Sequence, residues 1–222
     1  MNELELLGTA QNRKVYARHG AGPGTLGVSF ANLGKLARRI KTNHDLARQL
    51  WDSGISDARS LALMIASPTD VTEADLDHWI AGVSYYILAG SVAQFTHKTC
   101  FAVKKRKQWT ASRQEYVAQA GWDLVALAAM HDAEAGDGYF EQQLDTIEKR
   151  IHKAPNRVRH AMNGALIAIG IRNAHLEKLA VAAAKRIGKV EVDHGETSCV
   201  TPDAVAYIAK TKARKATRSR PR

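Results

Sequence analysis

Cysteine, proline and long apolar runs are all scarce in this sequence, and each scarcity excludes a class of protein. The 222 residues include five prolines and two cysteines, Cys100 and Cys199. Two cysteines so far apart form no CxxC metal clip and fit free thiols in a reducing cytoplasm. No apolar run approaches the ~18 residues of a membrane span, and the N-terminus MNELELLGTA lacks a signal-peptide pattern. We therefore expect a cytoplasmic protein that does not enter a membrane.

The alternating apolar and polar stretches of β-strands are also missing, which excludes a sheet as the basis of the fold. From Val28 onward, apolar residues instead recur at the i, i+3, i+4 spacing of helices. Amphipathic segments such as residues 139–153 alternate with almost continuously apolar segments such as residues 157–171. Apolar helices expected near residues 58, 117 and 158 lie 59 and 41 residues apart. This spacing brackets the ~40-residue helix pair of HEAT-type repeats if a weaker pair fills the longer gap.

A helix pair of this kind cannot cover its own apolar face, so neighbouring pairs must stack. We predict an all-α fold, a HEAT-like repeat solenoid in which antiparallel helix pairs form a curved array. A plain helical bundle is the alternative that the pattern leaves open. The length of 222 residues suits one such array.

Glycine content and charge divide the chain into three parts. Residues 1–27 carry four glycines and a proline near their end, which predicts a short helix followed by a loop. Residues 28–209 form the expected repeat domain. Residues 210–222 carry seven basic residues and no acid, and without them the net charge falls from +10 to +3. We predict a disordered basic tail that either touches nucleic acid or only aids solubility.

The short loop VDHGETSC, residues 192–199, holds four side chains of the types found at metal and acid/base sites: Asp193, His194, Glu196 and Cys199. They lack the helical or CxxC spacing of a metal site, and adjacent side chains tend to diverge. Gly188 suits the end of one helix, and Thr201 suits the N-cap of the next. We predict a structural corner without a metal ion, in which Asp193 and His194 orient the helix ends.

Two segments, APNRVRHAMNGALIAIGIRN and IGKVEVDHGETSCVTPDAVAYIAK, resemble the C-terminal half of bacterial DNA alkylation repair proteins, the AlkD-like, HEAT-like-repeat proteins. The resemblance covers residues 28–210 and is strongest over residues 137–210. The stretches LARQLWDSGISDARSLALMIA, VTEADLDHW and QWTASRQEYVAQAG extend it through the middle. It implies a solenoid that holds DNA in its concave groove. We expect a monomer that needs no cofactor. Glycosylase members excise cationic 3- and 7-alkylpurines without flipping the base into a pocket, unlike most glycosylases.

The motif that carries glycosylase chemistry in this family is a Trp-Trp-Asp-x-x-Asp-like run that opens an inner helix. The corresponding run here is SYYILAG, where Tyr85 and Tyr86 replace the aromatic residues and Ile87 and Gly90 replace the acids. A sugar cation that loses its carboxylate loses stabilisation worth ~100-fold or more in rate. The resemblance therefore implies the fold and ancestry of the family with weak or no glycosylase activity.

One acid does lie on a central inner helix. Asp123 follows Trp122 within an apolar segment, and a buried acid beside an aromatic ring could substitute for the missing motif acid. Our catalytic candidates are thus Asp123, Trp122, Tyr85 and Tyr86. An active alkylpurine glycosylase remains one alternative function.

Two basic clusters are candidates for contacts with DNA phosphates. The first surrounds the KAPN turn, and its members are Lys149, Arg150, Lys153, Arg157 and Arg159. The second precedes an inner helix, and its members are Lys104, Lys105, Arg106, Lys107 and Arg113. We predict that the protein binds duplex DNA, alkylated or branched. A charge of only +3 outside the tail keeps open a protein-binding scaffold, with a partner segment in the groove.

Overall fold

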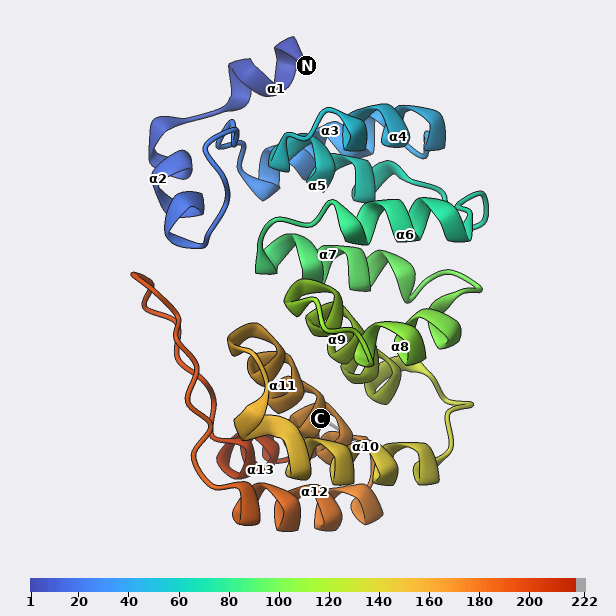
Figure 1. Cartoon of the computed structure of the whole chain (residues 1–222), viewed down its shortest axis with the longest axis vertical. Coiled ribbons are helices and arrows are strands. Elements are labelled where there is room, and N and C mark those ends of the chain that lie inside the picture. Colours follow the sequence, from blue (N-terminus) through green and yellow to red (C-terminus); the bar gives the residue numbers. More distant parts are fainter. Residues whose placement is uncertain (219–222) are drawn as a thin grey trace.

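The computed structural model describes residues 1–218 and is predominantly helical (Figure 1). These residues form thirteen α-helices and one 3-10 helix, and apart from a single bridge between Gly8 and Val28 they form no β-structure. The all-α prediction is confirmed. From α4 onward, the helices form pairs of an outer helix and an inner helix. The pairs are α4 (His44–Asp52) with α5 (Ser56–Ile65), α6 (Glu73–Ala81) with α7 (Tyr86–Thr96), α8 (Ala102–Thr110) with α9 (Glu115–His131), α10 (Asp137–Arg150) with α11 (Asn156–Arg172), and α12 (Ala174–Ile187) with α13 (Ala204–Arg218).

Consecutive inner helices lie parallel, as the stacking of HEAT-like pairs requires. At the N-terminal ends of α9 and α11, the Glu115 carboxylate accepts a hydrogen bond from the Arg157 backbone N–H at 2.7 Å. At their C-terminal ends, the Arg172 guanidinium donates to a backbone carbonyl of α9 at 3.1 Å. α7 and α9 are joined near their N-terminal ends, because the Gln119 side-chain amide donates to the Tyr86 carbonyl at 2.8 Å. The predicted array of stacked helix pairs is confirmed.

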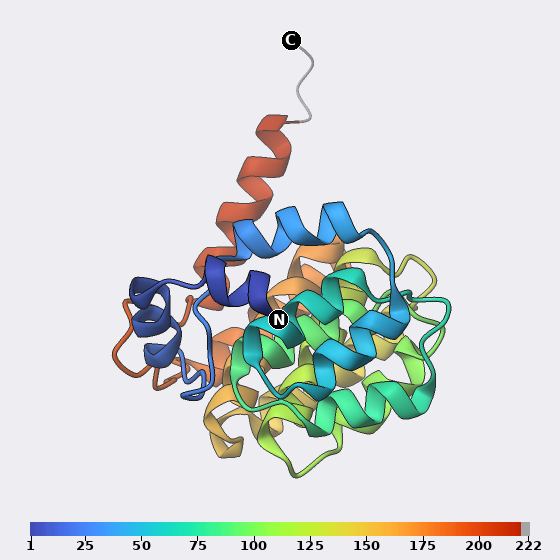
Figure 2. The same cartoon turned by 90° about the horizontal axis from the view of Figure 1, so that it is seen from above.

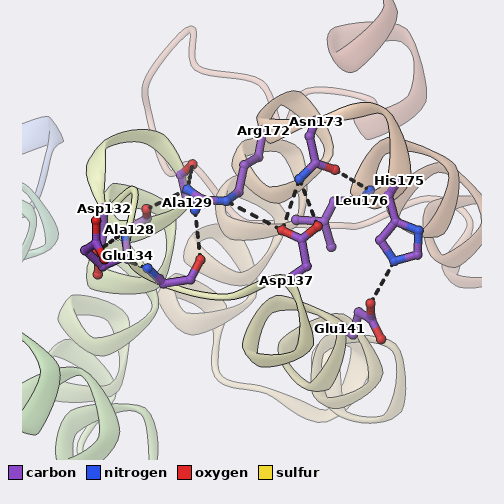
Figure 3. Close-up of polar contacts among 11 residues, drawn as sticks. Ala128, Ala129, Asp132, Glu134, Asp137, Glu141, Arg172, Asn173, His175 and Leu176 are labelled. Atoms are coloured by element: carbon purple, nitrogen blue, oxygen red, sulfur yellow. Dashed lines mark hydrogen bonds and ion pairs between the residues drawn. The ribbon is translucent and has the colours of Figure 1, made fainter.

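The C-terminal end of α9 is closed by a side chain of the following repeat (Figure 3). Arg172 donates to the carbonyl of Ala129 (3.1 Å), a group that the helix end leaves without a partner, and to the carbonyl of Ala135 (2.8 Å) in the loop that follows. Asn173 caps α12 by accepting a hydrogen bond from the Leu176 backbone N–H at 2.9 Å. This edge of the array is therefore occupied by its own structural contacts.

Tryptophans fill the spaces between repeats. Trp51 of α4 and Trp79 of α6 stack with their ring centroids 5.4 Å apart, and both are fully buried. α9 is apolar nearly all round because it belongs to two hydrophobic clusters. Leu124 packs with the N-terminal repeats and Val125 with the C-terminal ones. The two clusters thus lie on either side of α9, which contributes residues to both.

The N-terminal segment contains two helices, α1 (Asn2–Leu7) and α2 (Ala10–Arg18), where we expected one; α3 (Phe30–Ile40) follows the loop. The additional helix arises because Gly8 ends the first helix with an extended backbone, and the Thr9 hydroxyl accepts a hydrogen bond from the Asn12 backbone N–H, which caps the second.

Asp57, at the start of α5, fastens this N-terminal segment to the array. Its carboxylate accepts hydrogen bonds from the Thr25 hydroxyl (2.8 Å) and from the backbone N–H groups of Leu26 (2.7 Å) and Val28 (2.6 Å). The side chain is buried, since Asp57 is only 3% exposed. A buried donor that loses its partner destabilises a fold.

Asp57→Asn should therefore lower the free energy of unfolding by about 2 kcal/mol. The asparagine amide nitrogen cannot accept a hydrogen bond, so at least one donor of the segment loses its partner. Urea unfolding followed by circular dichroism measures the effect. Asp70→Asn, at an exposed carboxylate, is the matched control and should change stability by less than about 0.5 kcal/mol. Equal midpoints for the two variants would contradict the anchoring role.

The C-terminal segment differs from the prediction of a disordered tail over residues 210–222. α13 continues through Arg218, and residues 219–222 lie outside the described residues. The helix persists because alanine, lysine and arginine favour helices and because buried Ile208 anchors its first turns. Figure 2 shows its distal half projecting from the body of the molecule. No helix within residues 1–218 has the length and apolarity needed to cross a membrane.

The N-cap of α13 also differs from the prediction. The Asp203 carboxylate accepts a hydrogen bond from the Ala206 backbone N–H at 2.7 Å, so Asp203 is the cap. The Thr201 hydroxyl, which we expected in that role, is instead hydrogen-bonded to the His194 ring at 2.9 Å. One of the two residues thus serves the helix, and the other serves the preceding loop.

Candidate nucleic-acid interface

The inner helices α7, α9 and α11 all begin at one edge of the array, and exposed cations gather beside it. α10 ends at this edge, and the 3-10 helix η1 (Ile151–Lys153) leads from it into α11. Four of the five cations are exposed, and Arg157 is half-buried. We call this surface the basic edge; it consists of Arg113, Lys149, Arg150, Lys153 and Arg157.

Tyr86 connects the basic edge to the neighbouring repeat. The Arg157 guanidinium lies over the Tyr86 ring, 4.0 Å from its centroid, in a cation–π contact. The Tyr86 hydroxyl is hydrogen-bonded to Nδ1 of His19 from the N-terminal segment. Burial raises the pKa of Tyr86, so the hydroxyl remains neutral and can donate or accept a hydrogen bond. A half-exposed ring, a cation and a histidine thus meet where α7 begins.

Asp123 lies on α9 directly beside Gly90 of α7. A β-carbon placed on Gly90 would be 3.7 Å from Oδ2 of Asp123. The Gln119 amide nitrogen, one turn earlier on α9, donates to the same oxygen at 3.3 Å. Burial raises the pKa of Asp123 to about 6, and the Gln119 hydrogen bond opposes that shift only in part. Asp123, on the neighbouring helix, therefore places its carboxylate next to the point where the side chain of an acid at position 90 would start.

Comparison with known proteins assigns the family. A family model described as DNA alkylation repair enzyme matches residues 1–208 of the chain. The chain belongs to the DNA alkylation repair family. The resemblance that the sequence motifs indicated is confirmed, and it extends to the N-terminal segment that lay outside our expected range.

Two proteins similar to this chain come from Listeria. The chain is 32% identical to the uncharacterized protein Lin0241 of Listeria innocua serovar 6a over 219 residues, which cover 96% of this chain and 95% of that protein. It is 31% identical to the uncharacterized protein Lmo0209 of Listeria monocytogenes serovar 1/2a, with the same coverage.

A solved structure provides a more specific functional description. It matches 97% of this chain and 93% of its own length, with a TM-score of 0.89 and 31% sequence identity. It is described as part of a new family of proteins related to the HEAT-like repeat DNA glycosylases, with affinity for branched DNA structures. The HEAT-like fold is thus confirmed independently of the sequence motifs.

Two of the four catalytic candidates lie in the core. Tyr85 is 4% exposed, and burial raises its pKa to about 12. Trp122 is 2% exposed and packs among the C-terminal repeats. Both are buried because the start of α7 and the middle of α9 pack against the neighbouring helices. Asp123 and Tyr86 are the two candidates that stay partly exposed.

The basic run that we expected to follow phosphates is largely engaged in ion pairs. Lys105 has no exposed area and pairs with Glu73 (3.0 Å) and Asp77 (2.5 Å) of α6. Arg106 is 8% exposed and lies over the Tyr139 ring of α10, 4.5 Å from its centroid. We expected these two side chains to be exposed, but they are buried because they pack against carboxylates of α6 and an aromatic ring of α10. They thereby join α6, α8 and α10.

Other predicted contact residues divide in the same way. Lys104 and Lys107 are both exposed, and Lys104 pairs with Glu73 at 2.7 Å. Arg159 donates to the carbonyls of Glu191 (2.7 Å) and Ala154 (3.1 Å) and so holds the loop that follows α12. Arg159 therefore serves the fold in this structure, although we grouped it with the phosphate contacts.

The loop over residues 188–203, which we call the strap, crosses from α12 toward the N-terminal segment (Figure 1). Asn156 fixes it twice: its amide nitrogen donates to the Asp193 carbonyl (2.7 Å), and its side-chain oxygen accepts from the Asp193 N–H (2.8 Å). The His194 ring meets the His160 ring edge-on at 5.5 Å. A β-carbon on Gly195 would lie 3.8 Å from the Arg18 carbonyl oxygen. Within residues 1–218, no three His, Cys, Asp or Glu side chains are grouped as a metal site would require.

Two residues of the interface escaped the sequence analysis as contributors. His19 reaches Tyr86 from the N-terminal segment, which we interpreted only as a helix and a loop. Gln119 positions Asp123, and its side-chain oxygen is buried without a hydrogen-bond partner. Neither residue was among the candidates, because the contacts of His19 and Gln119 with Tyr86 join segments that are distant in the sequence.

Proposed function

We propose that the protein binds the phosphate backbone of DNA along the basic edge, prefers branched DNA, and acts in alkylation repair with weak or no base excision. The observation that carries this proposal is the group of exposed cations Arg113, Lys149, Arg150 and Lys153 beside the starts of α9 and α11. Each phosphate that a cation neutralises releases counterions, which drives association. The affinity of the solved relative for branched DNA structures supports the choice of partner.

The basic edge suits contacts that position DNA without reading its sequence. Exposed lysines and arginines contact phosphates, and such contacts carry no direct sequence information. Tyr86 offers a half-exposed ring beside Arg157 on which a sugar or base can rest. The Glu115 carboxylate already accepts the Arg157 backbone N–H, so the start of α11 attracts phosphate through its side chains more than through its backbone.

Reversing two charges of the basic edge should weaken DNA binding. We expect Lys149→Glu combined with Lys153→Glu to lower the affinity for a branched duplex about tenfold or more at about 100 mM salt. Fluorescence anisotropy over a series of salt concentrations measures both affinity and salt dependence. The control reverses two exposed cations of α3, Lys35→Glu and Arg38→Glu, which changes the net charge equally.

An equal loss in the control pair would mean that net charge alone, and not the basic edge, attracts DNA. Absence of wild-type affinity for duplex, branched and alkylated DNA at about 50 mM salt would end the proposal. In that case the protein-binding scaffold becomes the better interpretation.

A second candidate function is base excision, and one observation favours it. Asp123 brings a carboxylate beside Gly90, the position at which the family motif carries an acid. A carboxylate there could stabilise a developing sugar cation when a cationic alkylpurine leaves. With a pKa of about 6, the Asp123 carboxyl is mostly ionised at neutral pH and becomes protonated in mild acid.

A further inference from the structure

A second cationic surface lies on α13, at the opposite edge of the array from the basic edge. The contacts of α13 follow α11 along its length. Asn163, near the middle of α11, donates to the Pro202 carbonyl at 3.0 Å, and buried Ile208 packs against Gly170 near its end. α13 therefore runs in the same direction as α11 and continues past its C-terminal end. The basic edge lies at the N-terminal end of α11, which has 17 residues and thus a length of about 25 Å.

The projecting part of α13 is cationic and has little to neutralise it. We call residues 209–218 the α13 arm. Lys210, Lys212 and Arg214 are exposed, the sequence adds Lys215 and Arg218, and no acid follows Asp203. Lys212 pairs with Glu177 of α12, near the base of the arm.

Like charges one turn apart, such as Lys210 and Arg214, destabilise a helix. A helical segment without packing partners is also marginal in water. Figure 2 shows the arm projecting from the body of the molecule. A polyanion would remove the repulsion and add contacts along the arm. Charge complementarity thus identifies the occupant of the arm as a phosphate backbone.

We propose that the α13 arm binds the backbone of a second duplex arm of branched DNA, while the first duplex arm lies on the basic edge. This inference rests on the proposed function and adds a second contact surface to it. The two surfaces lie at opposite ends of α11, about 25 Å apart. Two duplexes that diverge from a branch point can contact one surface each, whereas a duplex that occupies the basic edge alone leaves the α13 arm free.

The test neutralises the arm and compares two DNA shapes. Lys210→Gln combined with Arg214→Gln removes two exposed charges while retaining helix-favouring side chains. The probes are a four-way junction and a linear duplex with the sequence of two of its arms. We expect the affinity for the junction to fall about tenfold at about 100 mM salt, and its salt slope to decrease by about 0.9 for each phosphate that is no longer neutralised. The affinity for the linear duplex should stay within about twofold.

The control variant is Lys35→Gln combined with Arg38→Gln on α3, which should leave both affinities unchanged. An equal loss for junction and duplex, or no loss for either, would overturn the role of the arm. Reversal of the basic edge would still weaken linear duplex binding in that case, so the proposed function would survive. If the wild-type protein binds neither probe, both proposals fail. Capture of anionic lipid vesicles by the arm, with junction binding unchanged by its neutralisation, would also overturn the inference.

Discussion

Gly121→Ala is expected to lower the free energy of unfolding by about 3–5 kcal/mol. A β-carbon at Gly121 would lie 2.3 Å from the backbone nitrogen of Thr110 and 2.5 Å from the carbonyl carbon of Trp109. Both atoms belong to the backbone at the end of α8, so no side-chain rotation can relieve the overlap. α8 and α9 would have to separate, and buried Trp109 would lose its packing.

A second glycine in a long helix supplies the matched control. Gly164 lies in α11, and a β-carbon there would meet no heavy atom within 4 Å outside its own helix backbone. Gly164→Ala should therefore stabilise the protein by about 0.5–1 kcal/mol, the ordinary difference in helix propensity. Urea unfolding of the two variants, followed at 222 nm in a circular dichroism spectrometer, measures both effects. Similar midpoints for the two alanine variants would contradict the close approach of α8 to α9.

Asp123→Asn should abolish most base release and at the same time stabilise the fold. Any release of 3-methyladenine or 7-methylguanine from alkylated DNA should fall ~100-fold or more, because asparagine carries no charge to oppose the sugar cation. The fold should gain as much as about 3 kcal/mol at pH 7–8, since burial raises the pKa of Asp123 from its usual 3.8 to about 6. A loss of activity combined with a gain of stability separates a chemical role from a structural one.

The direction of the pH dependence follows from that shift. The carboxyl ionises near pH 4 in the unfolded chain and near pH 6 in the folded protein, so the unfolded state gains stability between these values. The wild-type protein therefore loses stability as pH rises through that interval, whereas the Asp123→Asn variant does not. The difference between them should be small below about pH 4 and complete above about pH 7. Base release should show the opposite trend and rise as the carboxyl ionises.

Gly90→Asp has a different expected outcome in the wild-type protein than in the Asp123→Asn variant. An acid at position 90 would lie beside Asp123, and two adjacent carboxylates hinder each other's ionisation. Activity should therefore increase only when Gly90→Asp is combined with Asp123→Asn. Strong wild-type release that survives Asp123→Asn would assign the chemistry to another residue.

The array was predictable from the sequence because its helices differ in how they are buried. α9 and α11 are apolar almost all round, and this pattern identified them as inner helices before their neighbours were known. The burial of Lys105 could not be predicted in the same way. Its neighbours Glu73 and Asp77 come from another repeat, and the sequence around residues 104–107 resembles any solvated basic face. Whether a charged side chain is buried in an ion pair or exposed to solvent therefore depends on which repeat packs beside it.

The candidate site was only half predictable for a related reason. Asp123 could be identified from the sequence as an acid within an apolar helix, and Gly90 as the residue that replaces an acid of the family motif. Their proximity depends on the register between α7 and α9, which no local pattern specifies. The hydrogen bond between His19 and Tyr86 has the same origin, because it joins the N-terminal segment to an inner helix. The full length of α13 was missed because its charge suggested disorder, whereas Ile208 anchors it.

The strap also affects how the chain folds. In an open repeat array each unit contacts only its neighbours, so one end can unravel while the other stays intact. Here Gly195 of the strap lies against Arg18 of α2, which joins the last repeats to the first helices. Contacts between residues so distant in sequence raise the contact order and slow folding. They also make the two ends cooperative, so the array should unfold as one unit rather than fray from either end.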